Sequence, residues 1–182
     1  MRLLTDLYEI DGALTRHAAS RIPPGAATVL SAVEEAAEST KLWCGAAAVM
    51  AWKGGWRGRR AAAAGVVAMT VAQLVSNGLC KQLADRPRPP AEWIPHDEVA
   101  DRPDSSSFPS GHTAAAVAFT AAVAPTWLVA GALVALPATM VAVERVQSGA
   151  HYPSDVAAGA AIGLAAAWLT RRVPALFLRH WL

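Results

Sequence analysis

The sequence predicts an all-α integral membrane protein, with a bundle of about five spanning helices preceded by an amphipathic helix at the membrane surface. Hydrophobic residues make up 54% of the 182 residues, and charge is nearly absent from stretches 61–79, 113–143 and 156–170. Lys and Arg gather between and after these stretches. A bilayer tolerates charge only at the ends of spanning helices, so this segregation favours a membrane protein. The length fits one domain over residues 1–182.

A soluble, alanine-rich helical bundle is the alternative fold. The mean hydropathy is only +0.29, because alanine, a weakly hydrophobic residue, supplies much of the apolar composition. Hydropathy alone does not exclude a soluble bundle, whereas the charge segregation argues against it. The net charge of +2, with both signs interspersed, gives no indication of nucleic-acid binding.

Residues 1–24 are predicted to form an interfacial helix. Apolar residues recur there at helical spacing, with charged residues between them: Leu3, Leu4, Leu7, Ile10 and Leu14. This pattern is typical of a helix lying at a membrane surface, and Pro23 with Pro24 ends it. A helix packed on the bundle is the alternative interpretation, and the sequence does not choose between them.

Spanning helices are predicted over residues 26–52, 61–84, 112–124, 127–146 and about 154–170. The first is the weakest, because Glu34, Glu35 and Glu38 lie within it and charges this deep in a span are costly. Either the true span begins near Thr40 and is short, or these acids face a wet cavity lined by protein.

The basic residues predict the orientation in the membrane. In the five-span arrangement one side carries Lys53, Arg57, Arg59, Arg60, Arg171 and Arg172. By the positive-inside rule that side is cytoplasmic. Loops 85–109 and 147–153 then share the extracytoplasmic face.

Three polar clusters fall on that face, and the first contains Lys81 and Arg88, seven residues apart. Seven residues is close to two helical turns, so both cations can point the same way if the helix continues toward Asp85. Two converging cations suit a phosphate dianion. The alternative is that they are snorkelling anchors at the end of a span.

The second cluster, Pro109-Ser110-Gly111-His112, opens a helix. Ser110 is a predicted N-cap, and Gly111 lets the backbone approach a ligand closely. Free N–H groups at a helix start form an anion site, and His112 on the first turn could protonate a leaving oxygen. The alternative is a plain cap beside a solvated histidine.

The third cluster places His151 six residues after Arg145 and four before Asp155. A carboxylate at this spacing can hold an imidazole by one nitrogen and leave the other free to attack phosphorus. Taken alone, a histidine near an aspartate is usually structural. Together the clusters bring three cations, an anion site and two histidines to one face, which is what phosphoryl transfer needs.

The pattern Lys-x6-Arg-Pro, Pro-Ser-Gly-His and Arg-x5-His-x3-Asp, from Lys81 to Asp155, resembles the type 2 phosphatidic acid phosphatase (PAP2) superfamily. That superfamily includes bacterial lipid phosphatases, undecaprenyl-diphosphate phosphatases and vanadium-dependent haloperoxidases, and the helical frame of this chain is similar to its small membrane members. One departure is Glu144, where the family usually has Ser before the arginine of its third motif. This carboxylate could orient Arg145 or weaken anion binding.

The resemblance implies a role for each motif residue. His151 would be the nucleophile that forms a phosphohistidine, Asp155 would orient it, and His112 would be the acid for the leaving group. The residues expected to bind the substrate phosphate are Lys81, Arg88, Ser110, Gly111 and Arg145.

The expected function is metal-independent hydrolysis of a lipid phosphate or diphosphate, with no cofactor, by a multi-pass protein of the cell membrane whose site faces the extracytoplasmic side. Polyprenyl carriers are the first candidate substrates, and phosphatidic acid or phosphatidylglycerol phosphate are others. A vanadium haloperoxidase and a non-catalytic lipid-binding protein are the alternatives. The acidic loop 91–104 is either a lid that selects headgroups or a solvated loop.

Overall fold

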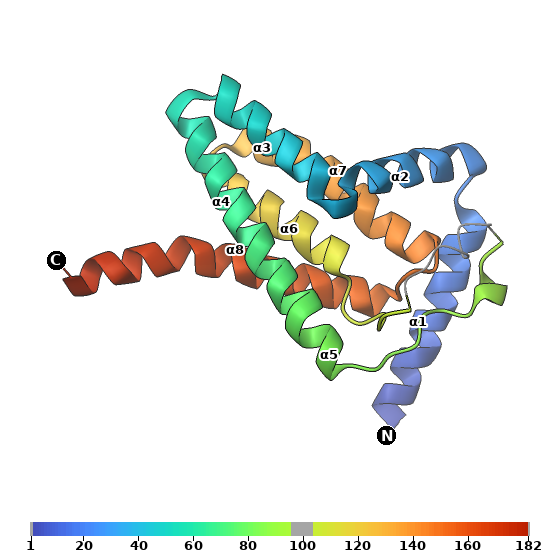
Figure 1. Cartoon of the computed structure of the whole chain (residues 1–182). Coiled ribbons are helices and arrows are strands. Elements are labelled where there is room, and N and C mark those ends of the chain that lie inside the picture. The colour runs from blue at the N-terminus through green and yellow to red at the C-terminus, as the bar shows by residue number, and fades with distance from the viewer. Residues whose placement is uncertain (1, 96–103, 182) are drawn as a thin grey trace.

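The computed structural model describes residues 2–95 and 104–181, and the side chains of residues 6–23, 25–95 and 104–172 within them. All regular structure in this part is helical, which confirms the all-α class (Figure 1). The α-helices are α1 (Arg2–Arg21), α2 (Pro24–Ala37), α3 (Lys41–Lys53), α4 (Gly55–Gln73), α5 (Lys81–Leu83), α6 (Gly111–Val123), α7 (Leu128–Gln147) and α8 (Pro153–Trp181). Three short segments are 3-10 or π-helical: η1 (Glu38–Thr40), η2 (Leu74–Cys80) and η3 (Ala91–Trp93).

Helix α6 is the centre of the bundle, with α4, α7 and α8 around it (Figure 1). Its alanines and Phe119 are almost fully buried. Helix α8 comes especially close, because Gly159 and Gly163 leave no room for a side chain beneath the backbone oxygens of Ser110 and Ala114. Small residues that let two backbones approach are the usual packing device of membrane helices.

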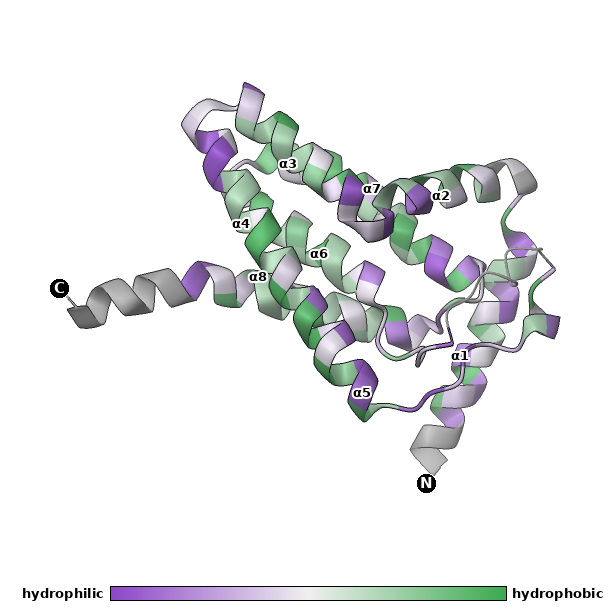
Figure 2. Cartoon of the chain, viewed as in Figure 1, coloured by the Kyte–Doolittle hydropathy of each residue, from purple (hydrophilic) through white to green (hydrophobic). Residues whose placement is uncertain are grey.

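Two continuous helices in the described part, Gly55–Leu83 and Leu128–Gln147, are long and apolar enough to cross a membrane. Only 28% of the apolar window of each is buried, and large side chains such as Leu133, 70% exposed, point outward. Figure 2 shows apolar residues recurring along the length of α4. An apolar surface of this extent fits contact with lipid better than contact with water.

The number of spans stays a prediction. Helices α3 and α6 have 13 residues each. At 1.5 Å per residue each is about 20 Å long, which is shorter than the roughly 30 Å hydrocarbon core. Neither crosses that core alone.

The prediction of one helix over residues 26–52 is wrong. Helix α2 ends at Ala37, Ser39 and Thr40 have positive φ angles of 52° and 65°, and α3 begins at Lys41. The structure therefore has the late start near Thr40 that was one of the two alternatives. Of the three acids, Glu34 is partly buried beside His112 and Arg145, whereas Glu35 and Glu38 are exposed.

The helices bring separate loops together at each end of the bundle. At one end the α3–α4 turn meets the α6–α7 turn, where the Arg57 Nε donates to the Thr126 carbonyl over 2.7 Å. At the opposite end lie α1, the segments around α5 and η3, the start of α6 and the α7–α8 loop (Figure 1). The three sequence motifs all fall at this second end.

Candidate active site

The turn after α7 positions His151. The Ser148 N–H returns to the Glu144 carbonyl over 2.9 Å, and Gly149 then takes a φ of +65°, which glycine adopts without strain. The chain folds back so that the His151 N–H donates to the Arg145 carbonyl over 2.8 Å. The imidazole is thereby held beside the end of α7 and is only 3% exposed.

The nearest hydrogen-bond partner of the His151 ring is a backbone carbonyl. Its Nδ1 lies 2.5 Å from the Ser107 oxygen, whereas the closest Asp155 oxygen is 4.0 Å away. That same Asp155 oxygen accepts from the Tyr152 N–H over 2.9 Å. If Nδ1 donates its proton to Ser107, the lone pair is on Nε2. Asp155 is thus a neighbour of the ring, and Ser107 occupies the place expected for it.

The three cations chosen from the sequence act together on His151. Burial, followed by the positive charges of Arg88, Arg145 and Lys81, lowers the pKa of His151 well below its ordinary value, although the Ser107 carbonyl opposes the shift. The imidazole is therefore neutral at pH 7, the form in which it is a nucleophile.

Lys81 and Arg88 converge, although not along one helix as predicted. Helix α5 ends at Leu83 and Ala84 is extended, so Arg88 lies beyond the helix. Both side chains instead reach the Ser105 hydroxyl, Lys81 over 3.5 Å and Arg88 over 3.4 Å. Arg88 also donates to the Ala150 carbonyl over 2.8 Å, which joins the first motif to the loop that carries His151.

The start of α6 has the predicted cap. The Ser110 hydroxyl accepts from the Thr113 N–H over 3.4 Å and is fully buried. Gly111 lies so close to the Asn77 amide that a side chain at 111 would overlap it. Asn77 comes from the π-helical segment η2, an irregularity that is common at functional sites. The role of Ser110 and Gly111 in binding phosphate stays a prediction.

Arg145 lies between two carboxylates. Its Nη2 is 3.0 Å from Glu34 and 2.5 Å from Glu144, which also accepts from Nε. Glu144 therefore orients Arg145. This is one of the two effects considered for a glutamate where the family usually has a serine. Glu34 is in addition 3.6 Å from the His112 Nε2. The sequence singled out Glu34 only as a costly charge, and its partners could not be read from α2 alone.

The acidic loop 91–104 falls largely outside the described residues, which resume at Asp104. Its described part does not extend away from the protein. Ile94 is buried, and the Trp93 ring packs beneath α1, with the Arg16 guanidinium 4.6 Å from its centre. No group of three or more His, Cys, Asp or Glu side chains that could hold a metal ion occurs in the described part of the chain.

The sequence profile of the PAP2 superfamily matches residues 61–178, which include all three motifs. The chain belongs to the PAP2 superfamily. Its fold is similar to that of a transmembrane PAP2-type phosphatidylglycerolphosphate phosphatase from Bacillus subtilis, with a TM-score of 0.70 and 21% identity over 93% of this chain and 86% of that one. It is also similar to LpxE from Aquifex aeolicus, with a TM-score of 0.69 and 23% identity over 88% of this chain and 93% of that one. No curated protein matches this PAP2 chain closely enough to count as a relative.

Proposed function

We propose that this PAP2 protein is a lipid phosphatase that hydrolyses a phosphate monoester or diphosphate through a phosphohistidine on His151. One observation carries the proposal. A buried imidazole, neutral and bonded through Nδ1 to a carbonyl, lies among three cations that come from two of the motifs. Few structural histidines need such an arrangement, whereas a histidine nucleophile does.

In the first step the His151 Nε2 lone pair forms an N–P bond while the bond from phosphorus to the leaving oxygen breaks. Lys81, Arg88 and Arg145 neutralise the charge on the other phosphoryl oxygens. Protonated His112 gives its proton to the leaving oxygen. Because the His151 ring gains positive charge as it is phosphorylated, the Ser107 carbonyl at 2.5 Å and the Asp155 carboxylate at 4.0 Å stabilise the intermediate.

In the second step a water molecule attacks the phosphorus. Neutral His112 takes a proton from the water, and the electron pair of the N–P bond returns to His151 Nε2. Inorganic phosphate leaves, and His112 is protonated again for the next substrate. The cycle consumes one water and uses no metal or cofactor.

The position of the site supports a lipid substrate. The motifs lie at the ends of apolar helices (Figure 2), where a headgroup can enter while its tail stays in the bilayer. The basic α3–α4 turn lies at the opposite end, so the positive-inside rule favours an extracytoplasmic site. Polyprenyl phosphates and diphosphates are the first candidate substrates. Phosphatidylglycerol phosphate is supported by the activity named for the Bacillus subtilis neighbour.

The experiment is phosphate release by the purified protein in detergent from polyprenyl monophosphate, polyprenyl diphosphate, phosphatidic acid and phosphatidylglycerol phosphate. His151→Ala is expected to lose at least about 10⁴-fold in kcat, and His112→Ala about 10²–10⁴-fold. An acid-labile phosphoenzyme is expected in the wild type and absent from His151→Ala. Activity should survive EDTA and be inhibited by vanadate.

Folded His151→Ala protein that retains wild-type turnover would refute the proposal. No release from any of the four lipids, together with vanadate-dependent halide oxidation, would favour a haloperoxidase instead.

A further inference from the structure

Arg86, inside the first motif, contacts both neighbours of the proposed nucleophile. Its side chain donates from Nη1 to the Asp155 carboxylate over 2.5 Å. Its backbone carbonyl accepts from the Ser107 N–H over 2.9 Å. Asp155 and Ser107 are the two groups beside the His151 Nδ1. One residue therefore contacts both groups, Asp155 through its side chain and Ser107 through its backbone carbonyl.

Asp11 on α1 fixes the other half of the Arg86 side chain. Its carboxylate accepts from Arg86 Nη2 over 2.7 Å, and from the N–H and hydroxyl of Ser154 over 3.0 and 2.5 Å. Ser154 also accepts from Arg86 Nη1 over 2.7 Å. Asp11 is 2% exposed and Asp155 is fully buried. The two carboxylates and the serine thus bond both terminal nitrogens of one arginine, whose side chain is 14% exposed.

Aromatic rings enclose the same guanidinium. The Arg86 Cζ lies 4.3 Å from the centre of the Tyr152 ring and 4.9 Å from that of Tyr8 on α1. A planar guanidinium presents two separate nitrogens to two carboxylates while its faces lie against rings, whereas a lysine offers a single nitrogen in their place. The arrangement is therefore specific for arginine.

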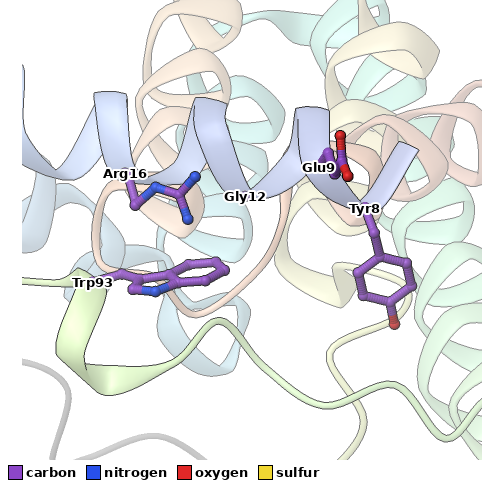
Figure 3. Close-up of a pocket in the computed structure, with 5 residues that line it drawn as sticks. All are labelled: Tyr8, Glu9, Gly12, Arg16 and Trp93. Carbon is purple, nitrogen blue, oxygen red and sulfur yellow. The ribbon is translucent and has the colours of Figure 1, made fainter. Parts of the chain in front are cut away.

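A second contact holds α1 in place. Trp93 packs against Gly12, where an added Cβ would lie 3.2 Å from the indole ring (Figure 3). The outer face of α1 is apolar and exposed, with Leu7, Ile10 and Leu14 44–56% exposed. The helix thus turns Asp11, Thr15 and Ala19 toward the protein and its apolar side outward, as an interfacial helix would. Residues 1–24 therefore pack on the bundle, and their position at a membrane surface stays a prediction.

We infer that Arg86, locked by Asp11 of α1, is a positioning residue that sets Ser107 and Asp155 on His151 and so aligns the imidazole for attack. This inference rests on the proposed function. Neither residue touches the reacting phosphate. The helix before the motifs is accordingly part of the active site and not only a membrane anchor.

The test compares Arg86→Lys and Asp11→Asn with the wild type. Lysine keeps the charge but replaces the two nitrogens that bond Asp155 and Asp11 with one. Asparagine keeps the bond from the Ser154 N–H but loses the acceptor for Arg86. Each variant is expected to lose about 10–100-fold in kcat, as substitutions of orienting partners commonly do, with KM nearly unchanged. Matched controls are Arg59→Lys and Asp6→Asn, both exposed, which should keep wild-type kinetics.

A double-variant cycle distinguishes the positioning role of Arg86 from a merely structural one. If Arg86 acts through Asp155, the loss in Arg86→Lys/Asp155→Asn should be much smaller than the product of the two single losses. Thermal unfolding in detergent and size-exclusion elution confirm that each variant is folded, and kcat is referred to folded protein.

Folded Arg86→Lys and Asp11→Asn with unchanged kcat would overturn the inference, as would losses that multiply fully with Asp155→Asn. Ser154→Ala, which removes two bonds and no charge, gives a milder probe if Asp11→Asn fails to fold. The proposed function fails separately, if His151→Ala keeps wild-type turnover.

Discussion

Two arginines at the active-site end each lie between two carboxylates, yet their surroundings differ. Arg86 bonds Asp11 and Asp155, which are 2% and 0% exposed, and it is stacked by two tyrosines. Arg145 bonds Glu144, 3% exposed, and Glu34, 18% exposed. Glu34 also approaches the proposed acid, His112. The two arginine side chains are about equally exposed, at 14% and 13%. The difference lies in their carboxylates, because Glu34 is the one that lies at the proposed anion site.

In the proposed mechanism the difference separates a residue that orients, Arg86, from a residue that binds the phosphate, Arg145. A carboxylate that is buried and saturated cannot be exchanged for a ligand, because its removal leaves an unpaired buried charge. A partly exposed carboxylate on a separate helix can move aside. In both cases the outer carboxylate comes from a helix before residue 61, where the match to the superfamily profile begins. Helices α1 and α2 thus lie outside that match, and each supplies a carboxylate to one of the two arginines.

The largest expected difference is in stability. Asp11→Ala removes a buried carboxylate from the partly buried Arg86, and we expect it to lower the free energy of unfolding by about 3 kcal/mol. Glu34→Ala removes a partly exposed partner and should lower it by less than about 1 kcal/mol. Chemical unfolding in detergent measures both values, with the exposed Asp6→Ala and Glu35→Ala as controls. Equal losses for the two variants would show that the two arginines are held alike.

A smaller effect is expected on anion binding. Glu34 places a negative charge 3.0 Å from Arg145, so Glu34→Gln should bind vanadate and inorganic phosphate more tightly. One charge at about 4 Å in water is worth about 1 kcal/mol, or about fivefold in the inhibition constant. Glu35→Gln, one residue along and exposed, is the matched control. If inhibition is unchanged or weaker in Glu34→Gln, Glu34 does not compete for the phosphate site.

The sequence predicted the features that depend on a local pattern or on a particular side chain. Apolar runs predicted the helices, and Ser110 is the cap that the start of α6 requires. The lowered pKa of His151 involves the three motif cations together. By contrast, the break at Ser39 and Thr40 has no Pro or Gly to signal it, and the backbone conformation there is one that such residues rarely adopt.

Contacts between distant segments were not predictable. Ser107 acts through its backbone carbonyl, which every residue possesses, so no side chain marks it. Asp11 and Arg86 are 75 residues apart, and nothing in either segment indicates the other. Asp11 in fact resembled one of the polar residues on the wet side of an interfacial helix. Only the fold shows that this side of α1 faces the catalytic loops.

The smallest expected effect is on the pH dependence of activity. It distinguishes the three motif cations, Lys81, Arg88 and Arg145, from Arg86. Positive charges disfavour the imidazolium, so with the pKa of His151 below its ordinary 6.5 the acidic limb of kcat/KM should lie below pH 6.5. Lys81→Met removes the cation that contributes least to this shift. The pKa of His151 then rises, and the acidic limb of the remaining activity should move to higher pH.

Arg86→Lys retains its charge, and Arg86 is not among the charges that shift the pKa of His151. The acidic limb of this variant should therefore stay in place while its kcat falls. Profiles measured on one substrate cancel the titration of the substrate phosphate itself.

An acidic limb at or above pH 6.5 in the wild type would mean that Lys81, Arg88 and Arg145 do not hold His151 neutral. A limb that moves equally in both variants would remove the distinction between these three cations and Arg86.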